Sequence, residues 1–285
     1  MLSRRAFVAV SSARMLGSQP SERRMFGNAE AYEKFMGRWS RQLAPLLVDF
    51  ADLPTAGHIL DVGSGTGALA FVLREQRPKV QITGIDPSAE YVAYASSRKK
   101  QGQQIEFQQG DAQRLSFADR TFTSALSLLV FNFIPDPGKA LREIVRVTKP
   151  DGKIVAAVWD YGDRMRMLRV FWDAAVSLDP SAEKLDEKHM QLCREGELGR
   201  LWKEAGLQDV EERSLEITMK FGSFRNFWDP FLLGQGPAGA YVRRLQPVGV
   251  PALRSEVKRR LGVQSEDRPI DLPARVWAVR GSIPA

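Results

Sequence analysis

The chain is poor in the residues that build disulfide and metal sites. Among its 285 residues there are one cysteine and two histidines. A single cysteine excludes a disulfide framework and any zinc or iron–sulfur site with several cysteine ligands, and it is typical of a reducing compartment. No stretch approaches the roughly 18 consecutive apolar residues that a membrane-spanning helix needs. We therefore predict neither a metal site nor a membrane span.

Most of the chain carries no strong excess of positive or negative charge. The net charge is +7, but residues 1–24 hold five arginines and one acid, so more than half of the excess falls on this short segment. A second basic cluster lies within residues 243–260, which we interpret as a solvated helix face. The sequence therefore does not predict a surface that follows nucleic-acid phosphates.

Residues 1–24 are predicted to be a disordered or targeting extension. They are rich in arginine and serine and resemble an organellar transit peptide, without the apolar core of a secretory signal. The alternatives are a plain extension or an upstream start codon, with Met25 as the working initiator. We expect a cytoplasmic protein, and a mitochondrial or other organelle matrix if the segment is a transit peptide.

Strand and helix signals alternate along the middle of the chain. Short apolar runs that end in glycines predict strands, and apolar residues at helical spacing predict the helices between them. The expected strands cover 58–62, 80–86, 105–111, 121–133 and 153–160, and the expected helices cover 68–75, 87–100 and 137–147. Such alternation is typical of a parallel sheet covered on both faces, a doubly wound α/β domain.

Further segments extend this domain at both ends. In open α/β sheets ligands bind beyond the carboxyl ends of the strands, so late insertions are candidates for a substrate lid. We predict one domain over 25–285, a Rossmann-like, mostly parallel seven-stranded sheet, with a helical cap over 29–51, later strands over 207–221 and 274–281, and helical lid insertions over 161–194 and 222–270.

The strongest motif is Asp61-Val62-Gly63-Ser64-Gly65-Thr66-Gly67, which leaves a strand and enters a helix. Glycines allow positive φ angles and a close approach of the backbone to a ligand, and the helix start offers free N–H groups. The Gly-x-Gly-x-Gly spacing differs from that of dinucleotide enzymes. A tight loop preceded by an acid suits a ligand with an amino-acid ammonium and carboxylate, and the alternative is a turn without a ligand.

Two more acids close the next two strands. Asp86 could accept hydrogen bonds from both ribose hydroxyls or could cap the following helix. Asp111, after Gly110, could accept from an adenine amine or could be an exposed turn residue. Because the carboxyl ends of parallel strands share one edge of a sheet, we expect these acids to converge on one crevice.

The motifs DVGSGTG, GIDPS and GDA, with the LLVFNFIPDPGKALREIVRVTKPDGKIVAAVWD segment, resemble class I S-adenosylmethionine-dependent methyltransferases. The likeness is to the small-molecule branch that includes quinone-pathway C-methyltransferases. It implies S-adenosylmethionine as cofactor, a small, partly apolar acceptor and in-line displacement of the methyl group. The cofactor contacts that it implies are Asp61, Gly63, Ser64, Gly65, Thr66 and Gly67 for methionine, Asp86, Pro87 and Ser88 for ribose, Gly110, Asp111 and Ala112 for adenine, Leu128 and Asn132 beside the sulfonium, and Tyr32, Met36 and Arg38 from the cap.

The sequence assigns no catalytic residue. A general base is needed only if the acceptor arrives protonated, and the candidates are Asp160 and His189. His189 and Cys193 are too few to form a zinc site. Aromatic residues after the fifth strand could enclose the acceptor or could form a core; they are Trp159, Tyr161, Phe171, Trp172, Phe224, Phe227, Trp228 and Phe231.

Two other functions stay open. One is a methyltransferase for nucleic acid or protein that uses the basic cluster at 243–260, and the other is a catalytically silent, cofactor-binding partner subunit. The sequence does not fix the oligomeric state.

Overall fold

The computed structural model describes residues 28–285, which form two compact units. The expectations for residues 1–24 lie outside the described residues. The sheet unit comprises Met36–Asp160, Met190–Ile217 and Arg275–Ala285, and the helical unit comprises residues up to Phe35, Tyr161–His189 and Thr218–Ala274. Both boundaries of the last segment fall inside strands, so β6 (Gln208–Phe221) and β7 (Ile270–Ser282) contribute residues to both units.

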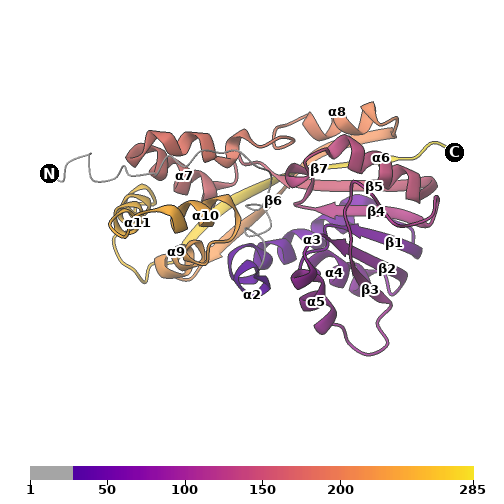
Figure 1. The fold of residues 1–285 in the computed structure, drawn as a ribbon, viewed down its shortest axis with the longest axis horizontal. Helices are drawn as coiled ribbons and strands as arrows, with labels where there is room; N and C mark the ends of the chain where they lie inside the picture. Colours follow the sequence, from indigo (N-terminus) through magenta and orange to yellow (C-terminus); the bar gives the residue numbers. More distant parts are fainter. Residues whose placement is uncertain (1–27) are drawn as a thin grey trace, which may run out of the picture. The chain divides into compact units, whose positions relative to one another are not determined.

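The sheet has the seven strands that the sequence predicts, and they lie in the order β3-β2-β1-β4-β5-β7-β6 (Figure 1). The pairings of β1 with β2 and β4, of β2 with β3, and of β4 with β5 are parallel, whereas β7 runs antiparallel to β5. The first five strands are Ala56–Val62, Lys79–Asp86, Ile105–Gln109, Phe122–Leu128 and Thr148–Trp159. The predicted fold class is therefore confirmed.

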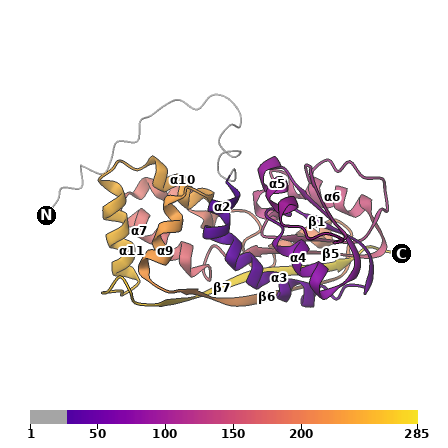
Figure 2. The ribbon, with the colours of Figure 1, turned by 90° about the horizontal axis from the view of Figure 1, so that it is seen from below.

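Helices cover both faces of this sheet. Figures 1 and 2 show α3, α4 and α5 on one face and α6 and α8 on the other. These helices are α3 (Arg38–Ala51), α4 (Ala68–Gln76), α5 (Ala89–Ser97), α6 (Pro137–Val147) and α8 (Glu197–Glu204). Because both faces are covered, the last four residues of β1 are buried, and Asp61 is the one charged residue among them.

Several predicted element boundaries are wrong. The fourth strand ends at Leu128 rather than at residue 133, because Leu129 adopts φ of 66° and Phe131–Phe133 form a 3-10 turn. The third strand ends at Gln109. The fifth begins at Thr148, so the expected turn before residue 153 lies within the strand, at an irregularity of its pairing with β4.

The helical unit holds α2 (Ala29–Tyr32), α7 (Arg166–Leu178), α9 (Phe224–Leu232), α10 (Gly236–Arg244) and α11 (Gly249–Arg260). The expected cap over 29–51 is helical throughout, with a π-helical turn over Glu33–Gly37 between α2 and α3. Within the insertion over 161–194 that we expected to be helical, Pro180–Leu185 and Glu187–His189 form short 3-10 turns.

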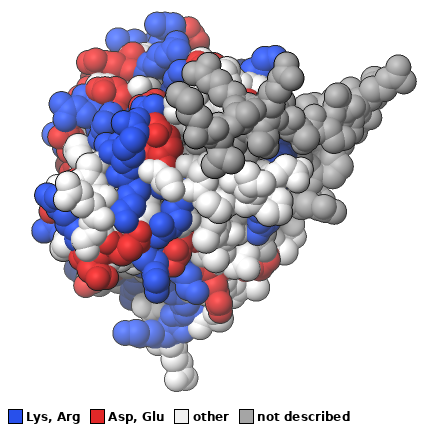
Figure 3. All heavy atoms as spheres, turned by 90° about the vertical axis from the view of Figure 1, so that its left-hand side faces the viewer, with Lys and Arg blue, Asp and Glu red and all other residues white. Residues whose placement is uncertain are grey.

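Most charges of the basic cluster are paired with acids. Glu256 accepts hydrogen bonds from Arg259 and Arg260, and Glu266 accepts from Arg254 and Lys258. The face in Figure 3 accordingly shows Lys and Arg side chains interspersed with Asp and Glu. This pairing supports the interpretation of the cluster as a solvated helix face.

Candidate functional site

The glycine-rich loop after β1 needs glycine at each of its three positions. Gly63, Gly65 and Gly67 have φ of 72°, 53° and 90°, a region that side chains disfavour. A Cβ atom on Gly63 would lie 2.4 Å from a methyl group of Val130, and one on Gly67 would lie 2.7 Å from the Phe71 ring. Near Gly65 only one atom lies within 4 Å of such a Cβ, so backbone conformation rather than crowding requires glycine there.

Hydrogen bonds join this loop to the ends of the next two strands. The N–H of Ser64 donates to the Ile85 carbonyl over 2.8 Å, and the N–H of Gly65 donates to the Asp86 carboxylate over 2.9 Å. The N–H of Gly110, after β3, donates to the Asp86 carbonyl over 3.1 Å. The carboxyl ends of β1, β2 and β3 are thus brought together, as the sequence predicts.

Asp61 is buried at this edge without a partner. Its side chain lies inside the protein, where the residue is 1% exposed, and neither carboxylate oxygen makes a hydrogen bond. Burial raises the pKa of Asp61 to about 8, and the negative charge of Asp86 adds to the rise. The Ala70 N–H lowers the pKa but lies outside normal hydrogen-bond geometry. Since buried carboxylates are normally paired, this site favours a cationic ligand group.

Asp86 is engaged with the backbone on both oxygens. One accepts from Gly65, and the other accepts from the N–H of Ser88 over 2.8 Å. Burial raises the pKa of Asp86 to about 6 against these two hydrogen bonds. Ser88, and not Asp86, is the helix cap, because its hydroxyl accepts from Tyr91. Pro87 therefore precedes α5 rather than lying in its first turn.

Asp111 and Ala112 lie where β3 has ended, in an irregular turn. Asp111 is exposed, and one of its carboxylate oxygens accepts from the backbone N–H of Gln113 over 2.8 Å. This contact fixes the carboxylate within its own turn. The turn also contacts the start of α6, because Gln113 accepts from the N–H of Asp136.

The predicted floor lies at the end of β4 and in the turn that follows it, and its contact with a cofactor stays a prediction. Leu128 and Asn132 are buried, and the amide of Asn132 lies 3.4 Å from the Met190 sulfur. Val130 fills the space in front of Gly63. The predicted floor therefore adjoins the glycine-rich loop.

The cap residues divide between the two units. Met36 is buried in the sheet unit, and Arg38 lies 4.4 Å from the centroid of the Trp39 ring. Desolvation lowers the pKa of Arg38 to about 10. Tyr32 belongs to the helical unit, and its cofactor contact stays a prediction.

The two candidate bases lie in different surroundings. Asp160 is buried and accepts two hydrogen bonds from Arg275, over 2.9 and 2.5 Å. His189 is 52% exposed and contacts Glu183. A role of either residue as general base stays a prediction.

The aromatic residues of the helical unit form a core, which is one of the two roles that the sequence leaves open. Phe171 and Phe231 stack with centroids 4.6 Å apart, and Phe227 packs on Phe221, Phe224 and Phe231. The six predicted aromatics from α7 and α9 are all fully buried; they are Phe171, Trp172, Phe224, Phe227, Trp228 and Phe231.

Cys193 is buried whereas His189 is exposed, and no helix joins them. Residues 28–285 contain no group of three His, Cys, Asp or Glu side chains that could hold a metal ion. No helix in this range is both long and apolar enough to cross a membrane.

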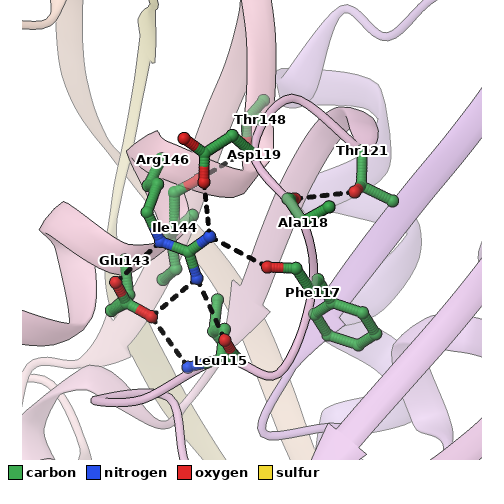
Figure 4. Close-up of polar contacts among 9 residues, drawn as sticks. All are labelled: Leu115, Phe117, Ala118, Asp119, Thr121, Glu143, Ile144, Arg146 and Thr148. Atoms are coloured by element: carbon green, nitrogen blue, oxygen red, sulfur yellow. Dashed lines mark hydrogen bonds and ion pairs between the residues drawn. The ribbon is translucent and has the colours of Figure 1, made fainter.

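Sequence reasoning missed a side-chain pair on α6 that fixes the turn after β3 (Figure 4). Glu143 and Arg146 bind the backbone of residues 115–117. Their spacing of three residues on a predicted helix indicates an ion pair, but the turn that they hold is distant in sequence.

Residues 60–156 match the family described as methyltransferase domain. This part of the chain is therefore similar to a methyltransferase domain. The match confirms the resemblance to class I S-adenosylmethionine-dependent methyltransferases, and it covers the glycine-rich loop and both following acids.

Curated relatives match mainly over this same region. The ubiquinone/menaquinone biosynthesis C-methyltransferase UbiE of Desulfotalea psychrophila is 36% identical over 118 residues, 41% of this chain and 46% of the relative. The demethylmenaquinone methyltransferase of Thermotoga maritima is 33% identical over 41% of this chain and 48% of the relative. The 2-methyl-6-phytyl-1,4-hydroquinone methyltransferase of Synechocystis is 32% identical over 44% and 39%. The chain thus spans about half the length of the curated relatives first matched.

Solved structures show the same fold. A phosphoethanolamine N-methyltransferase 2 of Haemonchus contortus, in complex with S-adenosyl-L-methionine, has a TM-score of 0.57 and 20% identity, over 90% of this chain and 57% of that one. The [4+2]-cyclase SpnF has a TM-score of 0.54 and 19% identity, over 86% and 81%. Since one neighbour is named a cyclase, the fold alone does not define the reaction.

Proposed function

We propose that this chain is a methyltransferase that transfers the methyl group of S-adenosylmethionine to a small, partly apolar acceptor. The observation that carries the proposal is Asp61, a buried carboxylate without a hydrogen-bond partner at the edge where three strand ends meet. Its burial would be costly without a cationic ligand group, and S-adenosylmethionine supplies an ammonium.

The residues of the methyltransferase domain suit each part of this cofactor. Asp61 and the glycine-rich loop would hold the methionine moiety, with the Ser64 hydroxyl buried and without a partner of its own. Asp86 is held by two N–H groups, and its remaining lone pairs would accept the ribose hydroxyls. Asp111 and Ala112 would receive the adenine. The cofactor supplies an activated methyl group, and the protein orients it and excludes water.

The acceptor class rests on the relatives. Three of them are named as methyltransferases of ubiquinone/menaquinone biosynthesis, of demethylmenaquinone or of a phytylated hydroquinone. We infer an acceptor with an aromatic or quinoid ring and an apolar part. The insertions at 161–194 and 222–270 are proposed to act as a substrate lid, and no residue is assigned as general base.

Cofactor binding provides the first test. We expect S-adenosylmethionine to bind wild-type protein in isothermal titration calorimetry and Asp86→Ala to weaken the affinity by at least tenfold, because both loop and ribose contacts depend on this carboxylate. Glu75→Ala, an exposed acid on α4, is the matched control and should leave the affinity unchanged. Absence of binding, or an Asp86→Ala variant that binds as wild type, would refute the assignment.

Turnover provides the second test. Methyl-labelled cofactor incubated with apolar quinols should yield a labelled acceptor. Cofactor binding without transfer to any of a broad panel of nucleophiles would instead support a silent partner subunit. Salt-sensitive binding to RNA would support a nucleic-acid substrate, although the pairing of Glu256 and Glu266 with the basic cluster disfavours it.

A further inference from the structure

The irregular turn after β3 is held by two side chains of α6 (Figure 4). The turn begins at Asp111 and Ala112, the proposed adenine contacts, and continues to residue 121 without a helix or a strand. A segment without regular backbone hydrogen bonds needs other partners to keep one conformation. Here Glu143 and Arg146 supply them.

Arg146 reaches three positions of the turn. Its Nη2 donates to the Leu115 carbonyl over 3.0 Å, and its Nη1 donates to the Phe117 carbonyl over 2.8 Å and to the Asp119 carboxylate over 2.7 Å. The side chain is 32% exposed. A planar guanidinium carries five N–H groups in a fixed fork, which lysine cannot reproduce.

Glu143 completes the arrangement from the same helix. Its Oε2 accepts from the N–H of Leu115 over 2.9 Å and from Arg146 Nη2, also over 2.9 Å, while its Oε1 accepts from Arg146 Nε over 2.9 Å. The neighbouring guanidinium lowers the pKa of Glu143, so the carboxylate stays ionised. Both backbone polar groups of Leu115 are therefore satisfied by this one ion pair.

The restraint continues from Leu115 to the proposed adenine contact. The N–H of Arg114 donates to the Asp111 carbonyl over 3.0 Å, and the N–H of Gln113 donates to the Asp111 carboxylate over 2.8 Å. Residues 111–114 thus form a hydrogen-bonded turn. Its last residue directly precedes Leu115, which Glu143 and Arg146 hold. A shift of Leu115 would therefore be transmitted to the carboxylate of Asp111.

We propose that Arg146 and Glu143 are positioning residues that hold the turn at Asp111 in the conformation that receives adenine. This inference rests on the proposed function, because it takes adenine to bind at this turn. The pair acts on the turn through the backbone of Leu115 and Phe117 and through the Asp119 carboxylate.

The test compares a ligand that carries adenine with one that lacks it. In the full chain, Arg146→Gln should weaken S-adenosylhomocysteine about tenfold and leave S-ribosylhomocysteine within twofold of wild type. The KM for S-adenosylmethionine should rise by a similar factor while kcat changes less than twofold. Arg142→Gln, at an exposed position of the same helix, is the matched control and should change neither affinity.

Hydrogen exchange gives a second readout. The Leu115 amide should exchange faster in Arg146→Gln than in wild type or Arg142→Gln, because its acceptor Glu143 loses its own anchor. If Arg146→Gln does not fold, Arg146→Lys and Glu143→Gln take its place, with smaller losses expected for the adenine-bearing ligand only.

The outcomes separate this inference from the proposed function. A folded Arg146→Gln variant that binds S-adenosylhomocysteine as wild type, or that weakens both ligands equally, would overturn the positioning role and leave the proposed function standing. Wild-type protein that binds neither ligand would overturn both.

Discussion

Replacement of Asp61 by asparagine should stabilise the protein without ligand and abolish its affinity for the cofactor. Asparagine has nearly the same shape as aspartate but carries no charge. In the folded chain the Asp61 carboxyl group is fully buried with a pKa of about 8, whereas its ordinary pKa is 3.8. Between these values the unfolded chain is ionised and the folded chain keeps the proton.

The sign and size of the effect follow from that difference. Because the folded state binds the extra proton, the free energy of unfolding of wild type falls as the pH rises from 4 to 8, by up to about 1.4 kcal/mol for each pH unit, and then levels off. Asp61→Asn lacks this dependence. Its stability advantage should therefore grow by up to about 3 kcal/mol between pH 5 and 7.

Urea unfolding at several pH values measures this directly. Asp49→Asn, on the exposed side of α3, is the control and should follow the pH dependence of wild type. Saturating S-adenosylmethionine should flatten the wild-type curve, since a cation at Asp61 keeps it ionised. Parallel curves for wild type and Asp61→Asn without ligand would refute the assignment of a buried, protonated acid.

Three further predictions concern the same domain. Because Asp61 must ionise to bind a cation, the affinity for S-adenosylmethionine should rise up to tenfold per pH unit between pH 6 and 8, and calorimetry that shows a flat profile would contradict this. Gly67→Ala should lower the free energy of unfolding by about 2–3 kcal/mol, because residue 67 has a positive φ and the new Cβ would contact the Phe71 ring. Gly102→Ala should lower it by only about 1 kcal/mol, because no atom lies near a Cβ at residue 102. Asp160→Asn should cost about 2 kcal/mol by leaving Arg275 without its ion pair, yet keep kcat within a few-fold; a lost kcat at full stability would support Asp160 as a base.

Local signals account for the success of the fold prediction. Each of the first strands is an apolar run that ends in glycines or an acid, and each helix begins after a turn residue, so short windows of sequence define them. The end of β4 was predicted wrongly because Leu129 adopts a positive φ, and no residue type there indicates this conformation. The irregular pairing at the start of β5 depends on Phe122 and Thr148, which are distant in sequence.

In the candidate site, too, the features that follow strand ends could be predicted, whereas those that depend on contacts distant in sequence could not. The glycine-rich loop and Asp86 follow strand ends directly, so their meeting could be predicted from the order of elements. The ion pair of Asp160 could not be predicted, because its partner Arg275 lies far along the chain. Glu143 and Arg146 were missed for the same reason, since their partners are carbonyls and an N–H of a distant turn, which carry no sequence signal.

The place of β7 in the sheet has a consequence for synthesis. β7 lies between β5 and β6, although it begins only at Ile270, long after β6 has ended at Phe221. While the ribosome is still making the intervening helices, β5 and β6 each present an open edge with no partner. A nascent chain at this stage is a natural client for chaperones, and a stop codon before Ile270 would leave that edge permanently open to aggregation.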